Sequence, residues 1–197
     1  KQFDQAWEND LEFEKGEKLM KQTEDSIDPY YPLINRSNWI ELFYTASCIY
    51  FSLGDNKKAL QWINRIFVDT EIDSRVDYSS SVKVLNMLIH YEMGHTEHLE
   101  YLVKSVQRYL RTKNMSMRLE AAVLEFIKKT LKAQSGEQQE AELRKLTRSL
   151  SLLRKDPYQK KAFDFFDVDA WAESKLQGRP FAEVVREKVR SVRKFTS

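Results

Sequence analysis

The chain has 197 residues, of which 42% are hydrophobic and 31% are charged, and its formal net charge is +2. This length suits one compact domain or one continuous repeat array, and the composition excludes a disordered chain. A single cysteine excludes an internal disulfide framework and a multi-cysteine zinc site. No window approaches 18 uninterrupted apolar residues, so the sequence predicts no membrane span.

Proline and glycine divide the first third of the chain into helices. Apolar residues recur at helical spacing over residues 3–23, and Pro29 and Pro32 predict a break after that helix. The next helix is expected to end at Gly54, because glycine readily takes the left-handed conformation that closes a helix. Asp55 is the predicted N-cap of the helix that follows.

Two further helical hairpins are predicted along the chain. The second pair of helices turns at Gly94, and the third turns at Gly136. Pro157 ends the third pair, and a short helix is predicted over residues 158–166. No segment has the sustained alternation of a strand, so the predicted fold class is all-α.

The C-terminal part is expected to hold two short helices. Asp169 is the predicted cap of a helix that reaches Leu176, and the last helix follows Pro180, which suits a first helical position. The last helix alternates valines with basic residues. We interpret it as a cap that lays its valines on the last hairpin and exposes its charges.

The most informative feature is a motif that occurs twice, 40 residues apart, in residues 49–60 and 89–100. Each copy runs from an apolar helix end through a glycine and a polar turn into an amphipathic helix, and such recurrence is typical of solenoids. Residues 46–67 resemble the tetratricopeptide repeat (TPR), a helix–turn–helix unit of about 34 residues. The matching positions are Ser47, Tyr50, Gly54, Asp55, Ala59 and Trp62. In the second copy, Leu99 and Val106 replace small residues, so that copy is degenerate.

The resemblance implies an α-solenoid, a TPR-like superhelix of antiparallel hairpins with a C-terminal capping helix, similar to long-repeat bacterial TPR proteins of unassigned role. We expect residues 1–197 to form a single TPR-like domain. Its expected parts are an N-terminal helix and proline-containing turn (1–35), two TPR-like hairpins (36–112), a third hairpin (113–156) and a helical cap (157–197). The chain starts at Lys1, and we expect it to be a fragment of a longer protein.

The same resemblance implies a non-enzymatic scaffold that holds a protein or peptide partner in a concave groove. The first helix of each pair would form the inner face of that groove. The candidate groove residues are Trp39, Phe43, Tyr50, Asn86, His90, Arg118, Lys128 and Lys129. We expect no membrane association and a cytoplasmic location, and self-association is left open.

Two alternatives stand beside the scaffold. A nucleic-acid-associated regulatory module would use the basic residues of the C-terminal helices, although nucleic acid is the less favoured partner. The third possibility is a purely structural segment of a larger multidomain protein.

The side chains that carry chemistry do not form an enzyme pattern. The three histidines, His90, His95 and His98, lie in one stretch, but their spacing does not give the ligand set of a catalytic zinc. The chain has no glycine-rich phosphate loop and no nucleophile elbow. Cys48 lies in an apolar helical run, which predicts a buried, unreactive thiol. We therefore expect no catalysis, no metal and no cofactor.

Overall fold

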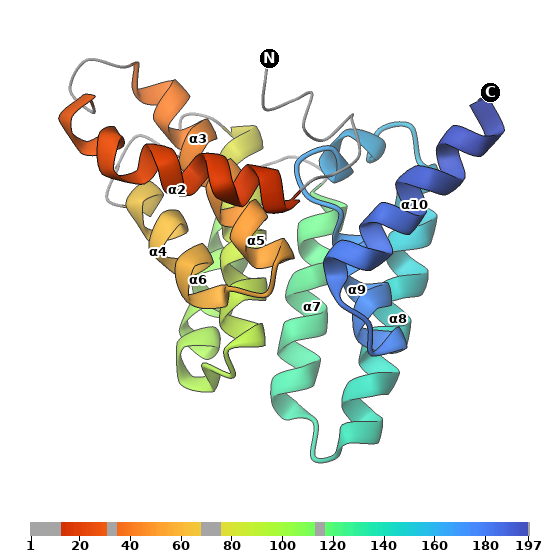
Figure 1. Cartoon of the computed structure of the whole chain (residues 1–197). Coiled ribbons are helices and arrows are strands. Elements are labelled where there is room, and N and C mark those ends of the chain that lie inside the picture. Colours follow the sequence, from red (N-terminus) through yellow and green to blue (C-terminus); the bar gives the residue numbers. More distant parts are fainter. Residues whose placement is uncertain (1–12, 31–34, 68–75, 113–116, 197) are drawn as a thin grey trace. The chain divides into compact units, whose positions relative to one another are not determined.

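The computed structural model describes residues 13–30, 35–67, 76–112 and 117–196, and the regular elements within these ranges are helices (Figure 1). They are α2 (Phe13–Tyr30), α3 (Arg36–Ser52), α4 (Asn56–Phe67), α5 (Val76–Glu92), α6 (Thr96–Thr112), α7 (Arg118–Lys132), α8 (Gly136–Lys155), the short 3₁₀ helix η3 (Lys160–Phe163), α9 (Val168–Gln177) and α10 (Phe181–Thr196). Within these ranges the all-α prediction is confirmed, and none of the helices is long and apolar enough to cross a membrane. The start of the predicted first helix, residues 3–12, lies outside the described residues.

The helices group into two compact units. The first contains α2, α3, α4 and α10, and the second contains α5 to α9. The two hairpins predicted for residues 36–112 therefore fall in different units. The segment predicted as one helical cap, 157–197, is divided between the units at Pro180.

Local hydrogen bonds close α3 and start α4. Gly54 has a φ of 82°, and its N–H donates to the carbonyl of Phe51, while the Asp55 N–H donates to the carbonyl of Tyr50. This pair of bonds is the Schellman closure, which satisfies carbonyls at a helix end. Asp55 Oδ1 then accepts the Lys58 N–H at 3.1 Å, so Asp55 caps α4 as predicted.

Aromatic side chains fill the core of the first unit between α3 and α4. Trp39 stacks on Phe43 with ring centroids 5.5 Å apart, and Phe43 meets Trp62 of α4 at 5.7 Å. Tyr50 and Ile63 are fully buried beside them. Offset aromatic contacts of this kind add to the hydrophobic stabilisation of the hairpin.

The last helix packs within the first unit. Phe181 of α10 meets Phe51 of α3 at 6.3 Å, and Arg186 donates to both carboxylate oxygens of Glu14 on α2. Among the described side chains of α10, Phe181, Ala182, Val184 and Val185 are buried. The sequence predicts packing on the last hairpin, α7 and α8, whereas the structure groups α10 with α2, α3 and α4. In a solenoid each repeat contacts only the repeats next to it in the chain. Here α10, at the end of the chain, contacts α2 and α3 near its beginning.

The second unit is built around α5. This helix contacts both α6 and α7, and the chain then continues through α7–α8 and α8–α9 contacts. Figure 1 shows α7 and α8 side by side, joined by a short turn. Ser135 Oγ accepts the Gln138 N–H there, which caps α8 and confirms the predicted turn.

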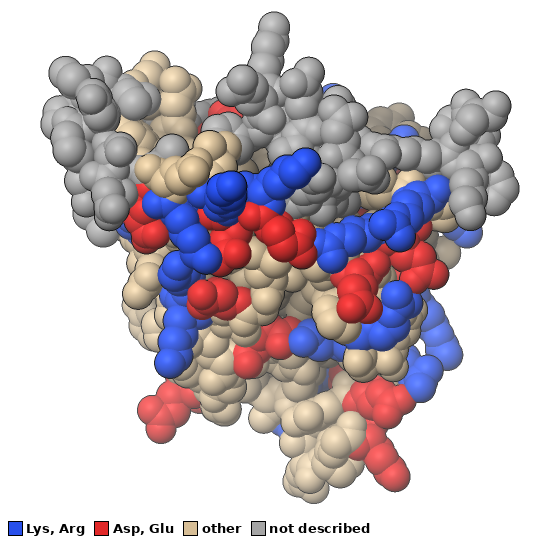
Figure 2. Space-filling view, viewed as in Figure 1, with Lys and Arg blue, Asp and Glu red and all other residues tan. Residues whose placement is uncertain are grey.

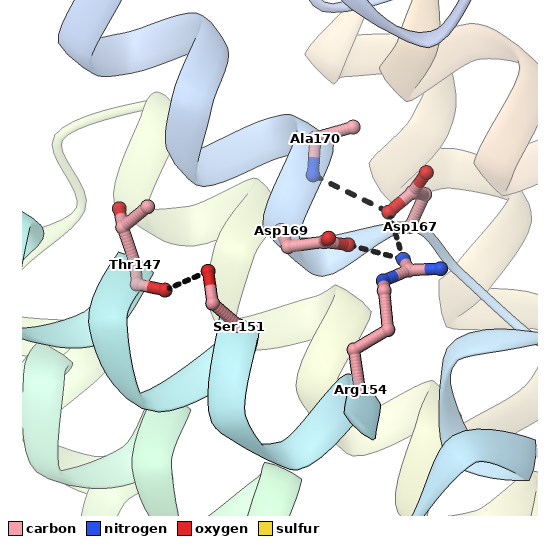
Figure 3. A network of polar contacts seen from close by, with 6 residues as sticks. All are labelled: Thr147, Ser151, Arg154, Asp167, Asp169 and Ala170. Carbon is pink, nitrogen blue, oxygen red and sulfur yellow. Dashed lines mark hydrogen bonds and ion pairs between the residues drawn. The ribbon is translucent and has the colours of Figure 1, made fainter. Parts of the chain in front are cut away.

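An ion-paired network joins the end of α8 to the start of α9 (Figure 3). Arg154 donates to the carboxylates of both Asp167 and Asp169. Asp167 also accepts the Ala170 N–H, so Asp167 is the N-cap of α9. The sequence predicts Asp169 as the cap, and this is wrong by two residues. Asp169 lies in the first turn of α9, buried, with its charge compensated by Arg154.

Two other helix boundaries differ from the predictions. The first helix is predicted to end near residue 23 and to be broken by Pro29 and Pro32, whereas α2 continues through Pro29 to Tyr30. Pro32 lies outside the described residues. A proline in the last turn removes a single backbone donor, so the helix can extend through it. The helix predicted over residues 158–166 is only the four-residue η3. Asp156 Oδ1 accepts the Tyr158 N–H, and this local turn competes with a helix there.

Candidate functional site at the α5–α6 hairpin

The turn between α5 and α6 repeats the closure of the first hairpin. Gly94 has a φ of 67°; its N–H donates to the carbonyl of Tyr91, and the His95 N–H donates to the carbonyl of His90. The left-handed residue reverses the chain within a few positions, so α6 begins at Thr96. Because the turn is short, side chains from both helices meet at this end of the hairpin.

The three histidines form one cluster at this turn. His90 Nδ1 lies 2.9 Å from His95 Nδ1, so one ring donates and the other accepts in complementary tautomers. The ring of His98 lies over His90 with centroids 4.1 Å apart. Burial, together with the nearby His98 and His95, lowers the pKa of His90 to about 4. His90 is therefore neutral at pH 7 and serves as a packed polar group.

The three imidazoles are not arranged as a set of metal ligands. Among the residues that the structure describes, no three His, Cys, Asp or Glu side chains are grouped as ligands for a metal ion. His90 Nδ1 and His95 Nδ1 already share a hydrogen bond. The arrangement therefore holds α5 and α6 together by imidazole contacts.

Glu92, at the end of α5, anchors the hairpin to α9. Its carboxylate accepts the indole N–H of Trp171 at 2.7 Å and the ammonium of Lys175 at 2.7 Å. The Trp171 ring makes edge contacts with Tyr91 and Phe126 at 5.8 and 5.9 Å. A buried tryptophan requires an acceptor for its N–H, and Glu92 supplies it.

The outward face of α6 carries an aromatic residue followed by cations. Tyr101 is 70% exposed, and Lys104, Arg108 and Arg111 are exposed on the same side of the helix. We call these four residues the α6 basic stripe. The structure places no ion-pair or hydrogen-bond partner on the three cations within its described ranges. The opposite side of α6 is buried through Leu99, Val103, Val106 and Tyr109.

Sequence reasoning missed the α6 basic stripe, although a signal was present. Residues 101, 104, 108 and 111 recur at the three- and four-residue spacing of one helix face. The resemblance to tetratricopeptide repeats directs attention to the first helix of each pair, whereas α6 is a second helix. The two faces of α6 differ in solvent exposure, and exposure depends on which other helices pack against α6.

Five of the eight predicted groove residues are buried in the described structure. They are Trp39, Phe43, Tyr50, Asn86 and His90, each less than 9% exposed. Trp39, Phe43 and Tyr50 lie on α3, and Asn86 and His90 lie on α5, so these side chains contribute to the packing of their helices and present little surface. Asn86 lies one helical turn before His90, and its Oδ1 is buried without a hydrogen-bond partner among the described residues.

The other three predicted groove residues are partly or largely exposed and form ion pairs. Arg118 contacts Asp156 at 2.9 Å, joining the start of α7 to the end of α8. Lys128 and Lys129 both pair with Glu125 on their own helix. The eight residues are divided between the two units: Trp39, Phe43 and Tyr50 belong to the first unit, and the rest to the second.

The single cysteine fits its predicted role. Cys48 is 1% exposed on α3, and burial raises the pKa of its thiol to about 12. The thiolate is the nucleophilic form of cysteine, so a thiol held protonated in this way is unreactive.

Comparison with protein-family models, curated proteins and solved structures finds no match to this chain.

Proposed function

We propose that this chain is a non-enzymatic protein-interaction module of TPR-like helical hairpins, and that it acts in the cytoplasm by binding a segment of a partner protein. The observation that carries this proposal is the outward face of α6. There Tyr101 is largely exposed beside cations that have no partner within the described chain. Exposed tyrosine and arginine are the residue types that dominate binding energy at protein interfaces.

The hairpin supports that face as a rigid platform. The Gly94 closure fixes the turn, the histidine cluster joins α5 to α6, and Glu92 ties α5 to Trp171 of α9. A binding surface on a pre-organised helix loses little conformational entropy when the partner docks. The interaction therefore needs no folding of the module itself.

Copurification tests the proposal. The tagged chain is expressed in its native cells, treated with a short crosslinker and purified beside an equally tagged helical protein of similar charge. We expect a protein that is enriched only with this chain and that binds again when both purified proteins are mixed. Nuclease treatment separates the nucleic-acid alternative. Enrichment that disappears after nuclease, or no enriched protein at all, would contradict the proposed function.

A further inference from the structure

We infer that the α6 basic stripe is a docking surface for an acidic segment of a partner protein, with Tyr101 contacting an apolar side chain of that segment. This inference rests on the proposed function and specifies the chemistry of its partner. Tyr101, Lys104, Arg108 and Arg111 span about 15 Å along one face of α6. A segment with carboxylates at successive turns, or at alternate positions of an extended chain, matches that length.

The cations of the stripe are arranged differently from those of several neighbouring helices. On α7 and α8, basic residues pair with a glutamate three or four positions away, as in Glu125–Lys128 and Glu140–Arg144. On α6, Arg108 instead has Lys104 four positions before it and Arg111 three positions after it. Like charges at these spacings destabilise a helix slightly, so intrahelical stability does not account for them.

The helix dipole accounts for only part of this pattern. Basic residues in the last turn of a helix interact favourably with its negative end, and Arg111 lies in that turn of α6. The dipole effect falls off within one turn, and Lys104 and Arg108 lie before it. Glu100 stands four positions before Lys104, yet the two form no ion pair in the described structure. Lys104 therefore remains available to a carboxylate from outside.

The surroundings of the stripe favour an acidic protein segment over nucleic acid. Glu97 and Glu100 are exposed at the Tyr101 end of α6 and would repel the phosphates of a polyanion that followed the whole helix. Figure 2 shows positive and negative side chains interspersed on the face in view, and the chain as a whole carries only +2. A protein segment can place carboxylates at the cations and neutral or basic residues at the glutamates.

Tyr101 supplies the apolar part of the surface. Tyr101 is 70% exposed, and its ring centroid lies 6.5 Å from that of His98, so most of the side chain is accessible to a partner. An amphipathic tyrosine can cover an aliphatic side chain while its hydroxyl stays hydrated. The occupant is therefore expected to combine acidic residues with at least one leucine-like residue.

Fluorescence anisotropy with a defined probe tests the inference. The probe is a labelled peptide of about 16 residues that repeats Glu-Glu-Leu-Ala, long enough to follow the stripe as a helix. The test variant carries Lys104→Glu, Arg108→Glu and Arg111→Glu. The matched control carries Lys132→Glu, Arg148→Glu and Lys155→Glu, which changes the net charge equally at exposed cations elsewhere in the second unit. Circular dichroism checks that both variants are folded. If the test variant does not fold, the same three positions are changed to glutamine instead of glutamate.

We expect the test variant to bind the peptide at least about tenfold more weakly than the wild type, with the control within about threefold. Tyr101→Ala should weaken binding by about three- to tenfold. Equal weakening in test variant and control would overturn the inference, as would an absence of peptide binding by the wild type. If a thymidine oligonucleotide of the same length bound more tightly than the peptide, the stripe would be a nucleic-acid site and the inference would be overturned. If a copurified partner binds the test variant as well as the wild type, the inference fails while the proposed function stands.

Discussion

Ser47 of α3 and Ala59 of α4 are in direct contact near the turn of the first hairpin. The hydroxyl of Ser47 donates a hydrogen bond of 2.9 Å to the carbonyl oxygen of Ala59, and both residues are completely buried. Two small side chains at this point let the helix backbones approach closely. The contact explains why the sequence has small residues at both positions.

Ala59→Trp should destabilise the first hairpin. The space between α3 and α4 cannot take an indole, so we expect the free energy of unfolding to fall by about 1–3 kcal/mol or more. Lys57→Trp places the same side chain at an exposed position of α4 and should change stability by less than about 0.5 kcal/mol. Urea denaturation of both variants measures the difference. Equal stability of the two would mean that Ala59 is not at a tight helix contact.

Glu92→Leu should loosen the second unit, because it leaves the buried indole N–H of Trp171 without an acceptor. An unsatisfied buried donor costs about 1–3 kcal/mol. Glu92→Gln keeps an acceptor oxygen and should retain most of the stability. Lys175→Ala removes only a partly exposed ion pair and should cost about 0–1 kcal/mol. Should Glu92→Gln prove as unstable as Glu92→Leu, the charge and not the hydrogen bond would be the main stabilising element.

Two arginines of α8 should differ in their contribution to stability. Arg154 compensates the buried carboxylate of Asp169, whereas Arg144 pairs with exposed Glu140. Arg154→Ala leaves a buried charge without its partner, and we expect a loss of about 1–3 kcal/mol. Arg144→Ala should cost less than about 0.5 kcal/mol. Thermal unfolding followed by circular dichroism compares the two, and similar melting temperatures would argue against a stabilising role for Arg154.

Acidification should destabilise the second unit through His90. Its pKa is lowered from an ordinary 6.5 to about 4 in the folded chain. Below pH 6.5 the unfolded chain therefore binds a proton that the folded chain does not accept. The contribution of neutral His90 to the free energy of unfolding is therefore complete above pH 6.5, declines as the pH falls, and is lost near pH 4. The total loss is up to about 3 kcal/mol.

The measurement compares the unfolding free energy at pH 7 and pH 4.5 in the wild type and in His90→Leu. The variant should lose less stability on acidification than the wild type. His98→Gln should keep most of the wild-type loss, because burial contributes more to the lowered pKa of His90 than His98 does. An identical pH dependence in wild type and His90→Leu would contradict a neutral buried His90.

The sequence predicted the hairpin turns well and the candidate site poorly. Gly54, Asp55, Gly94 and Gly136 lie where the predictions place them, because the chemistry of a cap or a left-handed turn involves only a few consecutive residues. The burial of the five predicted groove residues on α3 and α5 could not be predicted, for the opposite reason. Periodicity shows which residues share a helix face, but it does not show whether another helix covers that face.

Taken by itself, the sequence determined the all-helical class and the ends of the helical hairpins. These features depend on backbone dihedral preferences and on hydrogen bonds between near neighbours in the chain. Only the tertiary structure decided that α10 packs with α2 and α3, that His90 and Asn86 are buried, and that Tyr101 is exposed. Burial depends on contacts between segments far apart in the sequence, and the local pattern of apolar and polar residues does not identify those partners.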